Sequence, residues 1–287
     1  MYIIKLKTLL FAGLLLLTAA AGAVFGAVKI HTMTTSQQAG IPVPIIMYHS
    51  VLKSAKPKDR FVITPQAFEQ DLQYLREQGY TTVHMQDLID FCSSGKALPE
   101  KPVVLTFDDG FFNNYTYVYP LLQEYGQKAV ISIVGSYTDS YTESGDKNPN
   151  YAYLSWDECR EMAESGVIEI ENHSDSFHSI DTRRSGSRRN PSESAAVYEK
   201  IFKADISALQ DKITSQLGKT PTTYTYPFGM VSLESVAYTK DLGFAATLSC
   251  AEGINYLTGD PEELYLLKRC IRPNNKSVEE IFKSYLS

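Results

Sequence analysis

Four side chains of this chain could together bind a cation and activate water, and they form two short groups. Asp108 and Asp109 are adjacent, and His173 and His178 lie further along the chain. Neighbouring carboxylates repel each other, and a bound cation relieves that repulsion. One carboxylate can then bind the ion while the other takes a proton from water, and two imidazoles with one carboxylate leave coordination positions open. The residue types predict a hydrolytic metal site.

The two aspartates follow the apolar run Val103–Phe107 and precede Gly110. Successive side chains of a strand point to opposite faces, so both carboxylates can serve one site only if the backbone bends there. Gly110 allows such a bend, because glycine adopts backbone angles that other residues resist. On this motif alone, an ordinary turn that caps the next helix is an equal alternative.

The two histidines lie in E-N-H-S-D-S-F-H, directly after the strand-like run Val167–Ile170. On a helix their separation would place them about 140° apart, given about 3.6 residues per turn. On a strand the odd separation would place them on opposite faces. We therefore expect His173 at a strand end and His178 on a loop that curls back, so that both face one ion.

Composition narrows the class of partner. The 287 residues carry a formal net charge of -6, with a pI of about 5.5, so the chain lacks the basic excess of a nucleic-acid binder. The amount of apolar sequence suffices for a sizeable core. We expect a neutral or sugar-like partner, no nucleic acid, and a monomer.

The amino terminus predicts export. Lys5 and Lys7 precede the largely apolar stretch Leu9–Val28, so residues 1–28 are predicted to be a signal peptide or an uncleaved signal anchor. The flanking lysines favour a cytoplasmic amino terminus, with the rest on the extracellular face of the membrane or secreted. Residues 29–40 read as a linker, and the domain is expected over 41–287.

Apolar runs alternate with amphipathic stretches through the domain. The expected strands are Pro44–Val51, Thr81–Met85, Val103–Phe107, Ala129–Val134, Val167–Ile170, Tyr224–Tyr226, Ala245–Ser249 and Tyr265–Ile271. The expected helices are Thr64–Gln78, Met85–Ser94, Tyr117–Tyr125, Trp156–Ser165, Ala195–Leu217 and Val278–Tyr285. This alternation predicts an α/β fold, with a mainly parallel sheet or barrel and working residues at the carboxyl ends of strands.

The order of the motifs resembles a known family. T-F-D-D-G-F-F-N-N-Y, P-L-L-Q-E-Y-G-Q-K-A-V, N-H-S-D-S-F-H and T-Y-P-F-G are similar to motifs of the polysaccharide deacetylases with a NodB homology domain, carbohydrate esterase family 4. The resemblance covers about Ile41 to Ile271. It implies a deformed (β/α) barrel and metal-dependent removal of acetyl groups from an N-acetylglucosamine polymer, either an exopolysaccharide or peptidoglycan.

The resemblance also assigns roles to residues. By analogy, Asp108 is the catalytic base, and Asp109, His173 and His178 bind the metal. Substrate-binding positions would be Tyr226, Pro227, Phe228, Trp156 and Leu248, with a backbone N–H near Phe228 for the oxyanion. Core packing is an equal alternative for Trp156 and Leu248. Zinc is the expected ion, and cobalt, nickel or iron would fit the same ligands.

The chain departs from the family pattern at two places. Tyr224 and Thr225 stand where many members have an arginine that orients the base. The late stretch L-L-K-R-C-I-R lacks the histidine that many members use as an acid. His49, at the end of an opening strand like that of the exopolysaccharide deacetylases, is the predicted acid, and a packed histidine is the alternative.

Two rival functions and one cysteine question stay open. A catalytically inactive carbohydrate-binding module on the same fold would need no base, and a Mg²⁺-dependent phosphoester hydrolase would use more carboxylates. Among the four cysteines, Cys250 and Cys270 are the expected disulfide pair, and buried free thiols are an equal alternative. His84 is expected to be structural.

Overall fold

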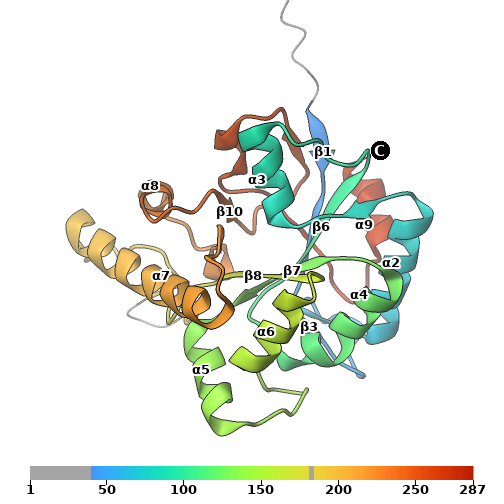
Figure 1. Cartoon of the computed structure of the whole chain (residues 1–287), viewed down its shortest axis with the longest axis horizontal. Helices are drawn as coiled ribbons and strands as arrows, with labels where there is room; N and C mark the ends of the chain where they lie inside the picture. Colours follow the sequence, from blue (N-terminus) through green and yellow to red (C-terminus); the bar gives the residue numbers. More distant parts are fainter. Residues whose placement is uncertain (1–39, 181–183, 287) are drawn as a thin grey trace, which may run out of the picture. The chain divides into compact units, whose positions relative to one another are not determined.

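A curled sheet of parallel strands forms the centre of the structure, a computed structural model that describes residues 40–180 and 184–286 (Figure 1). The strand order is β10-β9-β8-β7-β6-β2-β12, and β5 also pairs with β6. The strands are β2 (Ile45–Tyr48), β5 (Thr81–Thr82), β6 (Pro102–Phe107), β7 (Ala129–Ile133), β8 (Ile168–Asn172), β9 (Thr223–Thr225), β10 (Ala246–Leu248) and β12 (Cys270–Ile271). Each of these pairings is parallel, as the alternating sequence pattern predicted.

Two short pairs of strands flank this sheet. β1 (Ile41–Val43) pairs antiparallel with β11 (Asn255–Leu257), and β3 (Ser50–Val51) pairs parallel with β4 (Val62–Ile63). At the β10 edge, Leu248 forms an isolated bridge with Leu267, which precedes β12. The segment that leads into β12 therefore runs beside β10, although β12 itself pairs with β2 at the other edge of the sheet. The sheet thus curls into a half-barrel.

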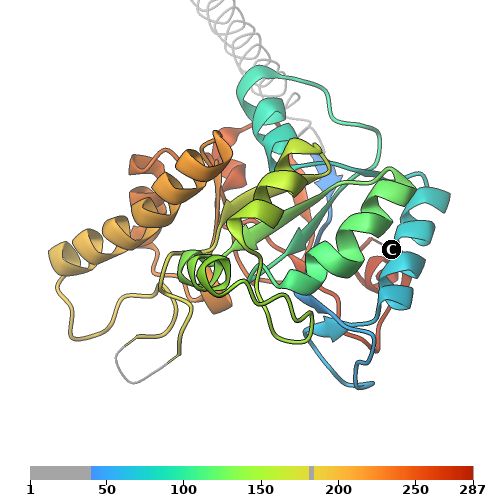
Figure 2. The ribbon, with the colours of Figure 1, turned by 60° about the horizontal axis from the view of Figure 1, so that its bottom comes forward.

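Helices surround the outside of the sheet, as Figure 2 shows. They are α2 (Pro65–Glu77), α3 (Met85–Ser94), α4 (Tyr119–Tyr125), α5 (Gly135–Ser144), α6 (Trp156–Glu164), α7 (Ala195–Leu217), α8 (Glu234–Asp241) and α9 (Val278–Tyr285). Shorter turns are a π-helical turn at Asn114–Val118 and 3₁₀ turns at Pro227–Gly229 and Pro261–Leu264. The sequence pattern predicted α3, α7 and α9 with these bounds and missed α5 and α8, whose residues have no clear apolar stripe.

Helix α2 shows how local sequence sets these elements. The Thr64 hydroxyl accepts the Ala67 N–H at 3.2 Å, which satisfies one of the free amides at the helix start. Phe68, Leu72 and Leu75 are fully buried on one face. Strand β5 is shorter than predicted because the chain turns at His84, the N-cap residue of α3, whose backbone N–H donates to Asp87 Oδ2 at 3.1 Å.

Two apolar layers fix the orientation of the strands. On β6, Val103, Leu105 and Phe107 pack outward among the helices, while Val104 faces the interior of the curl. Side chains alternate along a strand, so Thr106 and then Asp108 follow Val104 on the interior face. The sheet thus directs the predicted base inward.

The predicted membrane segment, residues 1–28, and the predicted linker up to residue 39 lie outside the described residues. None of the helices in the described ranges is both long enough and apolar enough to cross a bilayer.

The predicted disulfide is wrong in this structure: Cys250 and Cys270 are both free thiols, as are Cys92 and Cys159. The two sulfur atoms have different surroundings. Cys250 Sγ lies 3.7 Å from an Arg269 nitrogen, whereas Cys270 Sγ lies 3.5 Å from the Gly253 carbonyl oxygen.

Two buried glutamates of β8 also face the interior. Glu169 accepts N–H groups of Met85 and Gln86 at the start of α3, at 2.7 and 3.3 Å, and Glu171 accepts the Thr223 N–H at 2.7 Å. Burial raises the pKa of both carboxyls, that of Glu169 to about 7. The nearby Glu169 charge adds to the rise for Glu171.

This pair predicts a pH-dependent stability. A raised pKa means that the folded state holds protons more tightly than the unfolded chain, so the free energy of unfolding should fall as pH rises from about 4.5 through about 7. Glu171→Gln should flatten this fall, because it removes one of the two ionisations. Urea unfolding at several pH values measures it. The exposed Glu164→Gln variant should keep the wild-type slope, and an unchanged slope in Glu171→Gln would contradict the expectation.

Candidate active site

A cavity of about 360 Å³ opens at the carboxyl ends of the strands. It brings together the five side chains for which the sequence predicted chemistry, namely His49, Asp108, Asp109, His173 and His178. They come from positions directly after β2, β6 and β8 and from the loop beyond β8. The parallel sheet therefore gathers residues that are far apart in the sequence.

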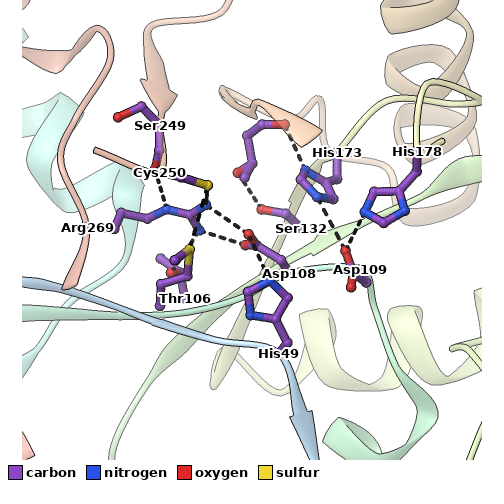
Figure 3. A network of polar contacts seen from close by, with 12 residues as sticks. His49, Thr106, Asp108, Asp109, Ser132, His173, His178, Ser249, Cys250 and Arg269 are labelled. Carbon is purple, nitrogen blue, oxygen red and sulfur yellow. Dashed lines mark hydrogen bonds and ion pairs between the residues drawn. The ribbon is translucent and has the colours of Figure 1, made fainter. Parts of the chain in front are cut away.

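Asp109 and the two histidines form a cluster that fits a cation (Figure 3). Asp109 Oδ1 lies 2.8 Å from His178 Nε2 and 3.4 Å from His173 Nε2. This buried oxygen nevertheless has no partner with hydrogen-bond geometry. One ligand atom from each of the three residues lies within 4.8 Å of the others. The donor set of two imidazoles and one carboxylate suits zinc and similar divalent ions.

Backbone geometry and charge shape this cluster. Asp109 has a φ of 74°, the left-handed conformation that bends the chain away from strand geometry. Burial alone would raise the pKa of Asp109, but His173 and His178 outweigh it and hold the pKa well below its usual value. Burial alone would lower the pKa of His173, and Asp109 and Asp108 outweigh it and raise that pKa. The cluster is therefore built around a carboxylate anion.

The orientation of His173 is set by its other ring nitrogen. Nδ1 lies 2.8 Å from the carbonyl oxygen of Thr225 on β9. A carbonyl only accepts, so Nδ1 must carry the proton and donate it. This contact directs Nε2 toward Asp109, as expected for a histidine that binds a metal through Nε2.

Asp108 is held by an arginine that the sequence analysis did not assign. Arg269 donates from Nη1 to Oδ1 at 2.7 Å and from Nη2 to Oδ2 at 2.8 Å. Arg269 is fully buried, and its Nε donates to the Ser249 carbonyl oxygen at 2.8 Å. Burial alone would raise the pKa of Asp108, but the charge and hydrogen bonds of Arg269 outweigh it and lower the pKa. The candidate base is thus kept ionised.

The position of Arg269 explains why it was missed. The sequence has no arginine beside Thr225, and Arg269 belongs to the late stretch that lacks the family's histidine. Arg269 precedes β12, whose pairing with β2 places it near β6. The sequence feature that could have identified it is an arginine directly before the short apolar strand Cys270–Ile271.

His49 lies on the other side of Asp108. Its Nε2 is 3.9 Å from Asp108 Oδ2, while its Nδ1 is buried and has no hydrogen-bond partner. Burial lowers the pKa of His49 and outweighs the opposing attraction of Asp108. Its ring packs against Phe61, with centroids 4.7 Å apart.

Of the predicted substrate-binding residues, Phe228 alone lines the cavity. Its φ is 56°, it is 40% exposed, and its ring centroid lies 4.4 Å from that of His178. Tyr226 and Pro227 are buried, and the Tyr226 hydroxyl contacts the Ser235 hydroxyl at 2.9 Å. These two residues support the turn that presents Phe228.

Trp156 and Leu248 do not line the cavity, in keeping with the core-packing alternative to their substrate role. Leu248 is fully buried in the interior apolar cluster. Trp156 is buried against the helices, and its indole N–H donates to Asp139 at 2.8 Å. His84 also lies away from the cavity and caps α3, consistent with a structural role.

Comparison with known proteins agrees with this geometry. Residues 95–247 match the family described as polysaccharide deacetylase, so the chain belongs to that family. The chain is similar to the poly-beta-1,6-N-acetyl-D-glucosamine N-deacetylase of Escherichia coli (strain K12), with 26% identity over 260 residues, 84% of this chain and 38% of that protein. Its counterpart in Staphylococcus aureus (strain N315) is 23% identical over 200 residues, 69% of this chain and 64% of that protein.

Solved structures share the fold. A de-N-acetylase from Aggregatibacter actinomycetemcomitans aligns with a TM-score of 0.72 and 27% identity, over 84% of this chain and 99% of that one. IcaB from Ammonifex degensii aligns with a TM-score of 0.68 and 22% identity, over 82% of this chain and 94% of that one. The chain thus spans nearly all of these solved chains but less than two thirds of the E. coli and S. aureus proteins.

The buried Asp108–Arg269 pair predicts a specific stability defect. In metal-free protein, Arg269→Met should lower the free energy of unfolding by about 3–5 kcal/mol at pH 7, because it leaves a buried carboxylate without its partner. Adding Asp108→Asn should recover part of the loss, since the unpaired charge is then gone. Urea unfolding measures both changes.

The control for this prediction is Arg188→Met, which alters an exposed arginine and should change stability by about 0.5 kcal/mol or less. A double variant no more stable than Arg269→Met would show that the lost ion pair is not the cause.

Proposed function

We propose that this chain is a metal-dependent N-deacetylase that removes acetyl groups from an N-acetylglucosamine exopolysaccharide. The observation that carries the proposal is the buried carboxylate Asp108, held by Arg269 directly beside the Asp109, His173 and His178 cluster. A protein that only binds sugar does not need a general base beside a metal site.

The proposed chemistry divides the work between the two aspartates. A divalent ion held by Asp109, His173 and His178 would polarise the acetyl carbonyl and make a water molecule more acidic. Asp108 would accept the proton of that attacking water. Arg269 would keep Asp108 ionised and fix both of its oxygens, so that the base points in one direction before substrate arrives.

His49 would pass the proton to the leaving nitrogen. Because burial lowers the pKa of His49, its imidazole favours the neutral form. Once protonated, the imidazolium is a stronger acid than an ordinary histidine and gives up its proton readily. Its Nε2 lies 3.9 Å from Asp108 Oδ2, which is beyond hydrogen-bond distance, so the proton that the base removes from water would reach His49 through one bridging water molecule or after a small movement of the ring. The amide N–H of Phe228 is the proposed donor to the oxyanion.

Two exposed aromatic rings support a sugar as the ligand. Phe61 is 48% exposed and Phe228 is 40% exposed, and both line the cavity. Phe61 packs on His49, the predicted acid, and Phe228 packs on His178, a predicted metal ligand. Apolar faces of this kind can pack against the C–H face of a pyranose while polar groups contact its edges.

The choice of polymer follows from the relatives. The similar E. coli and S. aureus proteins are named as deacetylases of poly-beta-1,6-N-acetyl-D-glucosamine, and we propose the same class of glycan here in preference to peptidoglycan.

We further propose that residues 1–28 direct the export of residues 41–287. This segment would then either hold the domain at the outer face of the membrane or be cleaved. Action as a monomer remains a prediction.

Acetate release tests the proposed function. The protein should release acetate from β-1,6-linked N-acetylglucosamine oligomers, lose this activity with a chelator, and regain it with zinc or cobalt. Asp108→Asn should lower turnover by at least ~100-fold with its metal content unchanged, because only the base is lost. His173→Ala should lose metal and activity together.

The exposed Asp157→Asn variant is the matched control and should retain wild-type turnover. Chelator-insensitive release would refute metal dependence. Glycan binding without acetate release under any of these ions would favour an inactive carbohydrate-binding module. Faster acetate release from peptidoglycan fragments than from the β-1,6-linked oligomers would identify peptidoglycan as the substrate instead.

The proton-transfer role of His49 makes a separate prediction. His49→Ala should lower kcat by ~100-fold or more while bound metal stays at the wild-type level. His84→Ala is the matched histidine control and should keep wild-type kcat per folded molecule, since His84 lies outside the cavity. Metal loss in His49→Ala, measured by elemental analysis, would instead make His49 part of the ion site.

A further inference from the structure

The loop between His173 and His178 must hold two metal ligands in one direction although it has no regular secondary structure. Ser174 has a φ of 74°, so the chain turns sharply directly after His173. The Ser174 N–H donates to the Asn172 side-chain oxygen at 2.9 Å, which fixes the start of the turn. The next two residues, Asp175 and Ser176, have backbone amides that need partners from elsewhere in the fold.

Helix α7 supplies those partners through one carboxylate. Asp205 Oδ1 accepts the Asp175 N–H at 3.0 Å, and Asp205 Oδ2 accepts the Ser176 N–H at 2.9 Å. Both oxygens of a single side chain therefore bind two consecutive amides, an arrangement that sets the direction of the loop as well as its distance from the helix. Asp205 does not line the active-site cavity.

Further contacts from α5 and α7 limit movement of the same loop. The carbonyl oxygens of Ser174 and Asp175 accept N–H groups of Gly135 and Ser136, at the start of α5, at 3.1 and 2.9 Å. Lys212, also on α7, donates to Asp175 Oδ1 at 2.5 Å. The loop is thus held between α5 and α7 by its donors as well as its acceptors.

We propose that Asp205 is a positioning residue that sets the loop between His173 and His178, so that both imidazoles face Asp109 before an ion binds. The proposal rests on the proposed metal site and adds a residue that binds neither metal nor substrate. Its physical basis is pre-organisation: without Asp205, the ion itself must order the loop, and the cost of this ordering weakens metal binding.

Zinc affinity tests the proposal directly. Asp205→Asn keeps the shape of the side chain but places an NH₂ donor against one of the two amides. Competition with a chromophoric chelator should give a zinc Kd about 10–100-fold weaker than that of the wild type. With Co²⁺ in place of zinc, the visible absorption bands should also change, because the ligand geometry changes. Asp211→Asn, an exposed aspartate on the same helix, should match the wild type in both measurements.

The outcomes separate this proposal from the proposed function. A wild-type protein that binds none of zinc, cobalt, nickel or iron would overturn the metal site itself. Wild-type zinc binding with an unchanged Kd and Co²⁺ spectrum in folded Asp205→Asn would overturn only the role of Asp205. If the variant fails to fold, amide hydrogen exchange on the metal-free wild type decides. Protected Asp175 and Ser176 amides support the proposal, and amides that exchange at unprotected rates refute it.

Discussion

The site depends on keeping two adjacent carboxylates ionised in a buried pocket. Asp108 is 3% exposed and Asp109 is 8% exposed, so burial pushes the pKa of each upward. Different groups stabilise the two charged carboxylates: the Arg269 guanidinium stabilises Asp108, and two imidazoles stabilise Asp109. Because the compensating groups differ, the two aspartates differ in what they can do: one is saturated by a fixed cation, and the other has an oxygen that is left for an ion.

This division requires a particular fold. Parallel strands end at the same edge of the sheet, so residues after β2, β6 and β8 converge there although long segments of chain separate them. The half-barrel adds a second requirement, because the segment before β12 runs beside β10 and carries Arg269 beneath Asp108. The left-handed backbone at Asp109 then separates the directions of the two side chains.

The surroundings of the site are as informative as its ligands. His173 is oriented by a backbone carbonyl of β9, and the loop that follows is held by α5 and α7. Phe228 is presented by a turn whose neighbouring residues are buried. Helices and strands therefore hold the irregular segments of the site in place, which is what a site needs if it is to bind an ion and a polymer without reorganising.

The sequence by itself determined the α/β class, the bounds of α3, α7 and α9, and the group of His49, Asp108, Asp109, His173 and His178. Each of these follows from local information: apolar periodicity, a residue type at a strand end, or an ordered motif. It could not supply Arg269 or Asp205, it left Trp156 and Leu248 open between a substrate role and core packing, and its expected Cys250–Cys270 disulfide was wrong. Those assignments depend on which distant segments lie side by side and which way each side chain points. The pairing of β12 with β2 decided the position of Arg269, and the packing of α7 against β8 decided that of Asp205.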